Sequence, residues 1–199
     1  EYAETKERYD YLKCQLDDLE ASKKELEGII GELEEEMRTM FTEAFHKINH
    51  NFGEVFRELF GGGTAKLKLQ DEKDVLNCGI DIVAQPPGKK LQNINLLSGG
   101  EKTMTAIAIL FAILKLRPMP FCVLDEIEAA LDEANVDRFA RYLKKFSQDT
   151  QFIVITHRKP TMELADALFG VTMQEKGVSR LVSVKLSDVA DITGDITLA

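Results

Sequence analysis

The first 40 residues repeat apolar side chains with the spacing of a coiled coil. From Tyr2 onward the apolar positions recur in alternating steps of three and four residues, and only Thr5 and Lys23 interrupt the pattern. The apolar positions are Tyr9, Leu12, Leu16, Leu19, Leu26, Ile30, Leu33, Met37 and Met40. The other faces are rich in Glu, Lys and Asp, and no proline occurs before Pro86. This spacing predicts a coiled-coil helix, with a solvated single helix or an amphipathic surface helix as the alternatives. So narrow a seam must pack against another helix. Because the sequence holds no second heptad tract, we expect the partner helix to lie outside these 199 residues.

Aromatic side chains widen the apolar stripe after Met40, as expected for a helix that enters a globular core. The widened stripe consists of Phe45, Ile48, Phe52, Val55, Phe56, Leu59 and Phe60. Glycines at 61–63 then end the helix, so we expect residues 1–60 to form a coiled-coil arm and neck helix. A phosphate-binding loop at these glycines is disfavoured, because no strand precedes them and no Lys-Ser or Lys-Thr follows.

Residues 61–186 carry the alternating strand and helix patterns of an α/β domain. Two half-exposed antiparallel strands are expected near 65–69 and 80–82, with Pro86, Pro87 and Gly88 ending that section. The later expected elements are a helix over 98–116, a buried strand over 121–124, a helix over 133–146, a strand over 152–156, a short helix after Pro160, and strands near 167–173 and 180–186. Strand, helix and strand in this order predict a parallel crossover. We expect residues 187–199 to form a frayed tail.

Composition excludes several classes of function. The longest apolar run, at 106–114, is less than half of the roughly 20 residues that cross a bilayer. Three cysteines lie far apart without C-x-x-C spacing, so neither a zinc site nor a disulfide framework is expected, and a reducing cytosol fits. A formal net charge of −9 argues against general nucleic-acid binding, so any DNA contact would be local. The sequence opens with Glu1 inside a helical pattern and shows no signal peptide, so we expect a piece of a longer protein.

A capping box marks the start of the helix expected over 98–116. Ser98 stands at the cap and Glu101 follows three residues later. The helix aims the positive end of its dipole at whatever precedes Ser98, and such an end binds anions. Gly99 and Gly100 are poor helix formers in a first turn, which suggests a backbone that a ligand approaches closely. Capping boxes are common, so this motif takes its meaning from the ones that follow.

Acidic and imidazole side chains stand at the ends of the two expected parallel strands. The first strand ends in Asp125-Glu126, the pair with which an ATPase holds magnesium on the first carboxylate and presents the second to an attacking water. A small-residue turn leads to Asp132, which is placed to cap the next helix. Thr156-His157 ends the second strand, and parallel neighbours put their carboxyl ends on one edge, so we expect His157 beside Asp125 and Glu126. The alternatives are a solvated strand end for the acids and a packing role for the histidine.

In combination these motifs resemble the carboxy-terminal half of an SMC head, the ATPase module of bacterial structural-maintenance-of-chromosomes proteins. The resemblance rests on the signature Leu-Ser-Gly-Gly-Glu-Lys at 97–102, the acidic strand end extended over 125–133, and Thr156-His157. The segments 85–90 and 155–159 are similar to the bacterial condensin branch. The resemblance covers nearly the whole chain and implies an ABC-type ATPase head fold, with a mixed or parallel sheet flanked by helices, behind a long coiled-coil helix.

One motif of that family is missing from the sequence. The nearest match to the P-loop pattern G-x-x-x-x-G-K-[ST] is Gly88-Lys89-Lys90, where Val83 replaces the first glycine and Lys90 replaces Ser or Thr. In the family this loop belongs to the amino-terminal half of the head, at the far end of the coiled coil. The resemblance therefore implies that this chain is an incomplete ATPase that holds half of an ATP site.

The resemblance also implies an ATP site shared between two heads. Ser98 and the amides of Gly99 and Gly100 would bind the γ-phosphate of ATP on the opposing head, and Asp132 would cross the dimer interface. The implied cofactors are ATP and Mg²⁺.

The residues implied to act in hydrolysis lie at the strand ends. Asp125 would hold magnesium through water, Glu126 would polarise the attacking water, and His157 would contact the γ-phosphate.

The implied partners are the amino-terminal half of the same head, a second SMC head in a homodimer, a ScpA-like kleisin subunit, and DNA that passes through the complex; no membrane partner is implied. The kleisin winged-helix domain is expected near the closing strands at 180–186. The implied work is chromosome condensation and segregation by a cytoplasmic, nucleoid-associated protein.

Three other interpretations remain open at the level of sequence. An SMC-related double-strand-break repair ATPase typically has proline after its acidic strand, where this chain has Ile127-Glu128. An ABC transporter nucleotide-binding subunit should not have a long coiled coil leading into the signature half. A structural scaffold with an inactive head is opposed by the presence of Glu126.

Overall fold

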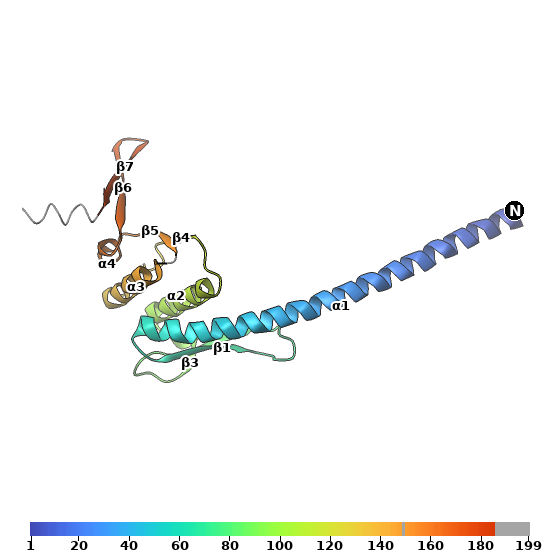
Figure 1. The fold of residues 1–199 in the computed structure, drawn as a ribbon, viewed down its shortest axis with the longest axis horizontal. Helices are drawn as coiled ribbons and strands as arrows, with labels where there is room; N and C mark the ends of the chain where they lie inside the picture. The colour runs from blue at the N-terminus through green and yellow to red at the C-terminus, as the bar shows by residue number, and fades with distance from the viewer. Residues whose placement is uncertain (149, 186–199) are drawn as a thin grey trace, which may run out of the picture. The chain divides into compact units, whose positions relative to one another are not determined.

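A computed structural model describes residues 1–148 and 150–185 of the chain (Figure 1). The predicted tail at 187–199 therefore lies outside the described residues. The chain divides into two compact units, one formed by 1–46 and 69–80 and the other by 47–68 and the described residues from 81 onward.

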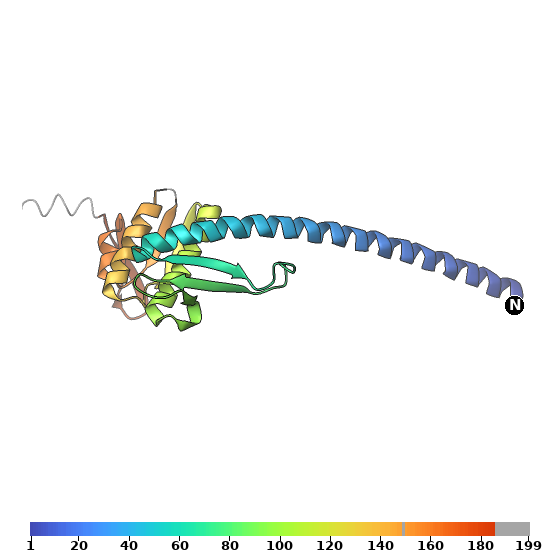
Figure 2. The ribbon, with the colours of Figure 1, turned by 90° about the horizontal axis from the view of Figure 1, so that it is seen from below.

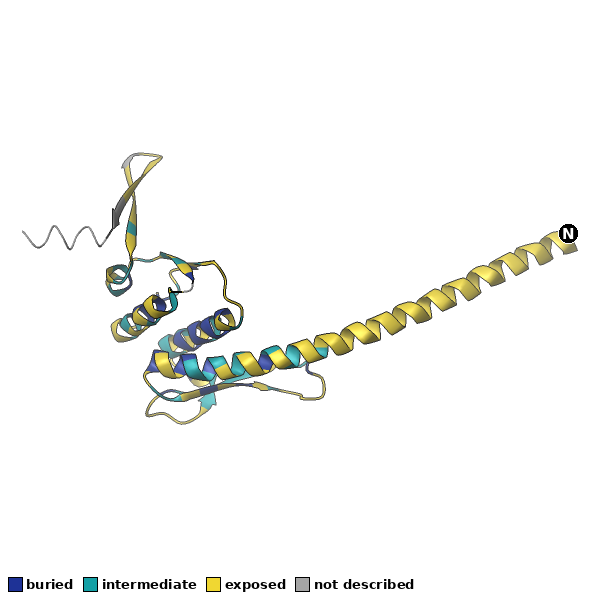
Figure 3. Cartoon of the chain, viewed as in Figure 1, coloured by how far each residue is buried: buried dark blue, intermediate teal, exposed yellow. Residues whose placement is uncertain are grey.

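The first unit contains most of α1 (Tyr2–Phe60), a single helix, as the sequence predicts. Its seam residues from Leu12 to Met40 are all exposed, and Figure 3 shows this part of the helix as exposed almost throughout. This part of the seam is therefore open within the described chain. In the same unit the Arg38 guanidinium donates a hydrogen bond to the Lys73 carbonyl at 2.9 Å, which ties the 69–80 segment to the helix.

In the second unit, the end of α1 buries its aromatic stripe, with Phe52, Phe56 and Leu59 fully enclosed. Residues 61–63 then turn the chain with φ values of +70°, +144° and +80°, a region that favours glycine. Gly63 is required on a second ground, since a Cβ there would lie 2.3 Å from the Gln85 carbonyl oxygen. The predicted turn is confirmed, and the backbone conformation of the turn accounts for its glycines.

A small sheet follows, with strand order β1-β2-β3, and Figure 2 shows β1 and β2 side by side. Its strands are β1 (Thr64–Leu69), β2 (Ile80–Gln85) and β3 (Gln92–Asn93), and β2 pairs antiparallel with β3. The sequence predicts the first two strands, and β2 ends directly before Pro86 as expected. It misses β3 and the 3₁₀ helix η1 (Ile94–Leu96), because elements of two or three residues are too short to show a hydrophobic period.

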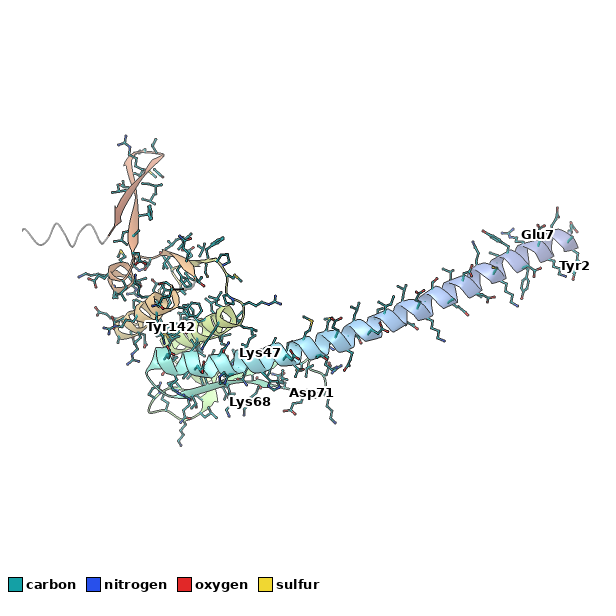
Figure 4. All side chains as sticks on the ribbon, viewed as in Figure 1. Tyr2, Glu7, Lys47, Lys68, Asp71 and Tyr142 are labelled. Carbon is teal, nitrogen blue, oxygen red and sulfur yellow. The ribbon has the colours of Figure 1, made fainter. Side chains whose placement is uncertain are left out.

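The core of the second unit lies between α2 (Gly99–Leu116), α3 (Glu133–Phe146) and the strands β4 (Phe121–Asp125) and β5 (Gln151–Ile155). Phe111 of α2 contacts a group of rings on α3 and β5, namely Phe139, Tyr142, Phe146 and Phe152; Figure 4 labels Tyr142. The two strands are parallel, with Asp125 opposite Ile155. The predicted crossover is therefore confirmed, with α3 at the expected bounds.

The prediction of a buried strand at 121–124 is wrong for one face of β4. Leu124 is buried, whereas Phe121 and Val123 are about half exposed, as are Ile153 and Ile155 on β5. A continuous apolar run predicts burial on both faces, because helices normally cover both faces of a parallel sheet. Within the described residues, only the face toward α2 and α3 is covered.

The described chain ends with α4 (Lys159–Glu163) and the antiparallel strands β6 (Ala167–Glu175) and β7 (Val178–Lys185). The helix starts one residue before Pro160 rather than after it, since proline fits a first helical turn. Val171 of β6 pairs with Leu181 of β7, and both side chains are exposed. Among the described residues, no helix combines the length and apolarity needed to cross a membrane.

Candidate functional site

The start of α2 has the predicted capping box. Ser98 is the N-cap, and the Glu101 carboxylate reaches back to accept from the Ser98 amide at 3.1 Å and from the Ser98 hydroxyl at 2.8 Å. The predicted capping box of Ser98 and Glu101 is therefore present, and the Ser98 hydroxyl in addition donates to the Glu101 carboxylate. Lys89 completes this cluster with an ion pair to Glu101 at 2.9 Å.

The charge of Glu101 is stabilised by these contacts. Partial burial alone would raise the pKa of the Glu101 carboxyl, but hydrogen bonds from Lys89 and Ser98 outweigh it and hold the pKa below its usual range. Gly88-Lys89-Lys90, the nearest match to a P-loop, therefore contributes its first lysine to the start of α2.

The two glycines of the signature differ in what surrounds them. A Cβ at Gly99 would meet nothing within 4 Å, so this backbone is open to an approaching group. A Cβ at Gly100 would lie 3.4 Å from the Ala130 carbonyl oxygen, so here the neighbour is the turn that follows β4. The structure thereby joins the signature to the acidic motif through Gly100.

Glu126 is held in an unusual backbone conformation at the end of β4. Its φ of +46° makes it the one non-glycine residue with positive φ in the described part of the chain. Its amide donates to the Ile155 carbonyl at 2.9 Å, which extends the β4–β5 pairing past Asp125. Strained residues of this kind persist where the surroundings fix them, and they are concentrated at functional sites.

His157 lies beside Glu126, as the parallel arrangement predicts. Its Nδ1 is 3.5 Å from the Glu126 carboxylate, and both side chains are more than half exposed. Asp125 is also exposed at the end of β4. The strand edge therefore presents a carboxylate and an imidazole to solvent, where they can reach a bound group.

The donor set suits magnesium only in part. The described residues contain no group of three or more His, Cys, Asp or Glu that could hold a metal ion by themselves. Mg²⁺ in ATPases is held by one or two carboxylates together with water and substrate phosphates, and Asp125 can supply one such carboxylate. The residues therefore fit an ion that arrives with a nucleotide.

The turn after β4 ends at Asp132 as predicted, because the Asp132 carboxylate accepts from the Asn135 amide at 2.9 Å and caps α3.

Sequence reasoning missed two other residues near the site. Glu128 is 1% exposed and Arg158 is half-buried. Both make hydrogen bonds that connect this turn to the segment after β5. The available signal for burial was an acidic residue placed between the uncharged Ile127 and Ala129, three residues after the end of β4.

Comparison with known proteins finds a matching family model and similar relatives. The family model described as "RecF/RecN/SMC N terminal domain" matches residues 5–180. "Chromosome partition protein Smc" of Bacillus subtilis (strain 168) is 61% identical over 191 residues, which is 96% of this chain and 16% of that relative. The chain thus spans about one sixth of the length of this curated relative.

Two solved structures share the fold. The Smc head domain of Pyrococcus furiosus, with an extended coiled coil and bound to the C-terminal domain of ScpA, has a TM-score of 0.75 and 42% identity, covering 97% of this chain and 48% of that one. A structure described under ATP-driven dimerization and DNA stimulated activation of SMC ATPases has a TM-score of 0.71 and 42% identity, covering 81% and 98%. The α/β arrangement is therefore that of an ABC-type SMC head, and the chain belongs to the RecF/RecN/SMC family.

Proposed function

We propose that this chain is the carboxy-terminal half of the ATPase head of a bacterial SMC protein, and that it works in chromosome condensation and segregation. The observation that carries the proposal is the pairing of Glu126 with His157 at the ends of two parallel strands. A carboxylate and an imidazole at one strand edge, beside an exposed Asp125, match the chemistry of ATP hydrolysis. The name of the Bacillus relative favours chromosome partition over double-strand-break repair or transport.

The choice of the carboxy-terminal half rests on three features of the chain. The matching family model is named for an amino-terminal domain. The assignment to the carboxy-terminal half is therefore based on the order of motifs, in which the coiled coil precedes the signature. The sequence has no P-loop pattern, and the apolar face of β4 and β5 around Val123 and Ile153 is open. The amino-terminal half would supply the P-loop and cover this face.

The proposed division of the chain is an arm and neck at 1–60, a head lobe at 61–186 and a tail at 187–199. The end of α1 at Phe60 supports the first boundary. The compact units differ from it, because residues 47–60 already pack with the head residues.

Hydrolysis would divide among three residues of this chain. Asp125 would hold Mg²⁺, which when bound would neutralise charge on the phosphates. Glu126 would accept hydrogen bonds from the attacking water and orient it, acting as the general base. His157 would donate to the γ-phosphate from the ring nitrogen that does not face Glu126.

The signature would act on a second head. The open backbone at Gly99, the Gly100 amide and the Ser98 hydroxyl would bind the γ-phosphate of ATP held there, because helix N-termini bind phosphate. Asp132, at the end of the turn, would cross to the same partner. The description of SMC ATPases by ATP-driven dimerization supports this arrangement.

The exposed hairpin would bind the winged-helix domain of a ScpA-like kleisin. Val171 and Leu181 offer an open apolar pair on β6 and β7, and the Pyrococcus head binds the C-terminal domain of ScpA. With DNA passing through the assembled complex, the protein would reside in the cytoplasm at the nucleoid.

The test is ATP turnover by a head reassembled from this chain and the amino-terminal half encoded by the same gene. Glu126→Gln keeps the side-chain shape and loses the charge that orients water, so turnover should fall by about a hundredfold or more while ATP binding remains. Glu133→Gln, an exposed carboxylate in the first turn of α3, is the matched control. A reassembled head without turnover, or Glu126→Gln turnover near that of the unaltered head, would contradict the proposal.

A further inference from the structure

Glu128 is a buried acid that the proposed mechanism does not use. Its Oε1 accepts hydrogen bonds from the Thr156 hydroxyl at 2.5 Å and the Thr161 hydroxyl at 3.3 Å. These partners lie on both sides of His157 in sequence, at the end of β5 and within α4. The side chain therefore binds the turn after β4 to the segment that carries His157.

Arg158 makes the opposite connection. Its Nη2 donates to the Ala129 carbonyl at 3.0 Å and to the Leu131 carbonyl at 3.2 Å, both in the turn after β4. The Arg158 amide also donates to the Thr156 hydroxyl at 3.0 Å, so that hydroxyl serves both connections. We call the group of Glu128, Thr156, Arg158 and Thr161 the clasp.

We propose that the clasp is a positioning device that holds Glu126 and His157 at their working separation, an inference that rests on the proposed function of these two residues. His157 lies between two residues of the clasp in sequence. Glu126 begins the turn that the clasp holds, through a bond from the Ala129 amide to the Glu126 carbonyl at 3.0 Å. The strained backbone of Glu126 needs such support, because strain persists only where surrounding contacts fix it.

A purely structural role explains the clasp less well. The Oε2 of Glu128 and the Nε of Arg158 are both buried without a hydrogen-bond partner among the described residues. Buried polar atoms without partners cost stability, so an apolar cluster of the same shape would serve the fold better. What a hydrogen-bonded cluster adds is one defined geometry between the turn after β4 and the segment that carries His157.

The clasp also lies where a second head would arrive. Ala130, in the turn, is the neighbour of Gly100 in the signature, and the turn ends at Asp132. A shift of this turn on head pairing would pass through Glu128 and Arg158 to the His157 segment. The clasp would thus connect pairing of the heads to the alignment of the hydrolytic residues.

The first experiment measures the coupling of Glu126 to His157 by nuclear magnetic resonance of the chain. With only three histidines, the ring signals of His157 can be assigned by comparison with His157→Gln. The shift of these signals on Glu126→Gln is measured in the unaltered chain, in Glu128→Gln and in Glu128→Met. Glu128→Gln retains an acceptor oxygen and should keep the shift; Glu128→Met retains the size without the acceptor and should reduce it to less than about half.

The second experiment measures turnover of the reassembled head. Glu128→Met should lower kcat by roughly tenfold to a hundredfold, as small misplacements of reacting groups do, with KM for ATP within about twofold. Glu128→Gln should restore turnover. A loss of stability alone would lower the amount of folded protein and leave the kcat of the folded fraction intact.

Each outcome decides between the alternatives. If Glu128→Met folds and keeps both the coupling and kcat, the clasp has no positioning role. If it does not fold, Arg158→Met interrupts the clasp from its half-buried side; failure of both variants to fold would show general structural support and overturn the proposal. If the unaltered reassembled head has no turnover, the proposed function fails, while the resonance experiment still decides whether the clasp positions His157.

Discussion

Two open apolar surfaces on this chain should bind two different partners, and a crossed pair of substitutions can separate them. Val123 and Ile153 face each other across β4 and β5, and Val171 and Leu181 face each other across β6 and β7. Replacing the first pair by alanine should weaken binding of the amino-terminal half of the head. Replacing the second pair should weaken binding of the kleisin winged-helix domain.

The expected losses of binding free energy follow from the exposed fraction of each side chain. Val123 and Ile153 are 54% and 49% exposed. Full burial of an aliphatic side chain contributes roughly 1.5–3 kcal/mol, so covering the open half of both contributes about 2 kcal/mol. Because 1.4 kcal/mol is a factor of ten, the double alanine variant should bind about thirtyfold more weakly. Val171 and Leu181 are 71% and 74% exposed, which gives roughly 3 kcal/mol and about a hundredfold.

Isothermal titration calorimetry of each double variant against each purified partner provides the assay. Each variant is the matched control for the other, since both remove two aliphatic groups from an open surface and the melting temperature shows whether the chain still folds. The reasoning is refuted if either double variant weakens both partners equally, or if the Val123 and Ile153 variant binds the amino-terminal half as tightly as the unaltered chain.

Two further predictions concern the signature and the half-buried Tyr142. In the reassembled head, Ser98→Arg should abolish ATP-dependent pairing of heads but spare ATP binding, with about 1 kcal/mol of stability lost with the cap; size-exclusion chromatography with ATP checks this, and persistent pairing would place the interface elsewhere. Burial, then repulsion from Glu58 and Glu54, raises the pKa of Tyr142 to about 12. The folded state favours the neutral phenol, so its contribution to stability is complete below about pH 10 and is lost as pH rises toward 12. Denaturation midpoints should therefore fall less over this range in Tyr142→Phe, and equal falls would contradict the assignment.

The sequence predicts the elements and the strand-end pairing because local signals specify both. Asp132 has the residue type of an N-cap, and α3 begins directly after it. The pairing of Glu126 with His157 follows from a topological rule, since a crossover helix makes neighbouring strands parallel and brings their carboxyl ends together.

The features that sequence reasoning missed depend on contacts between distant residues. An apolar run such as Phe121–Asp125 specifies a strand, but not which of its faces this chain covers. Glu128 is charged, and charged residues are read as exposed unless a partner is known; its partners Thr156 and Thr161 lie 28 and 33 residues away. The positive φ of Glu126 likewise arises from its surroundings, because glutamate has no preference for that conformation.

The left-handed backbone at Glu126 has a consequence for laboratory evolution of this protein. Holding a glutamate at φ +46° costs on the order of 1 kcal/mol, which glycine or asparagine at the same position would not incur. A screen that rewards heat resistance alone should therefore select Glu126→Gly or Glu126→Asn. If Glu126 has its proposed role in hydrolysis, such a screen would enrich inactive proteins, and libraries of this head would need selection for turnover in every round.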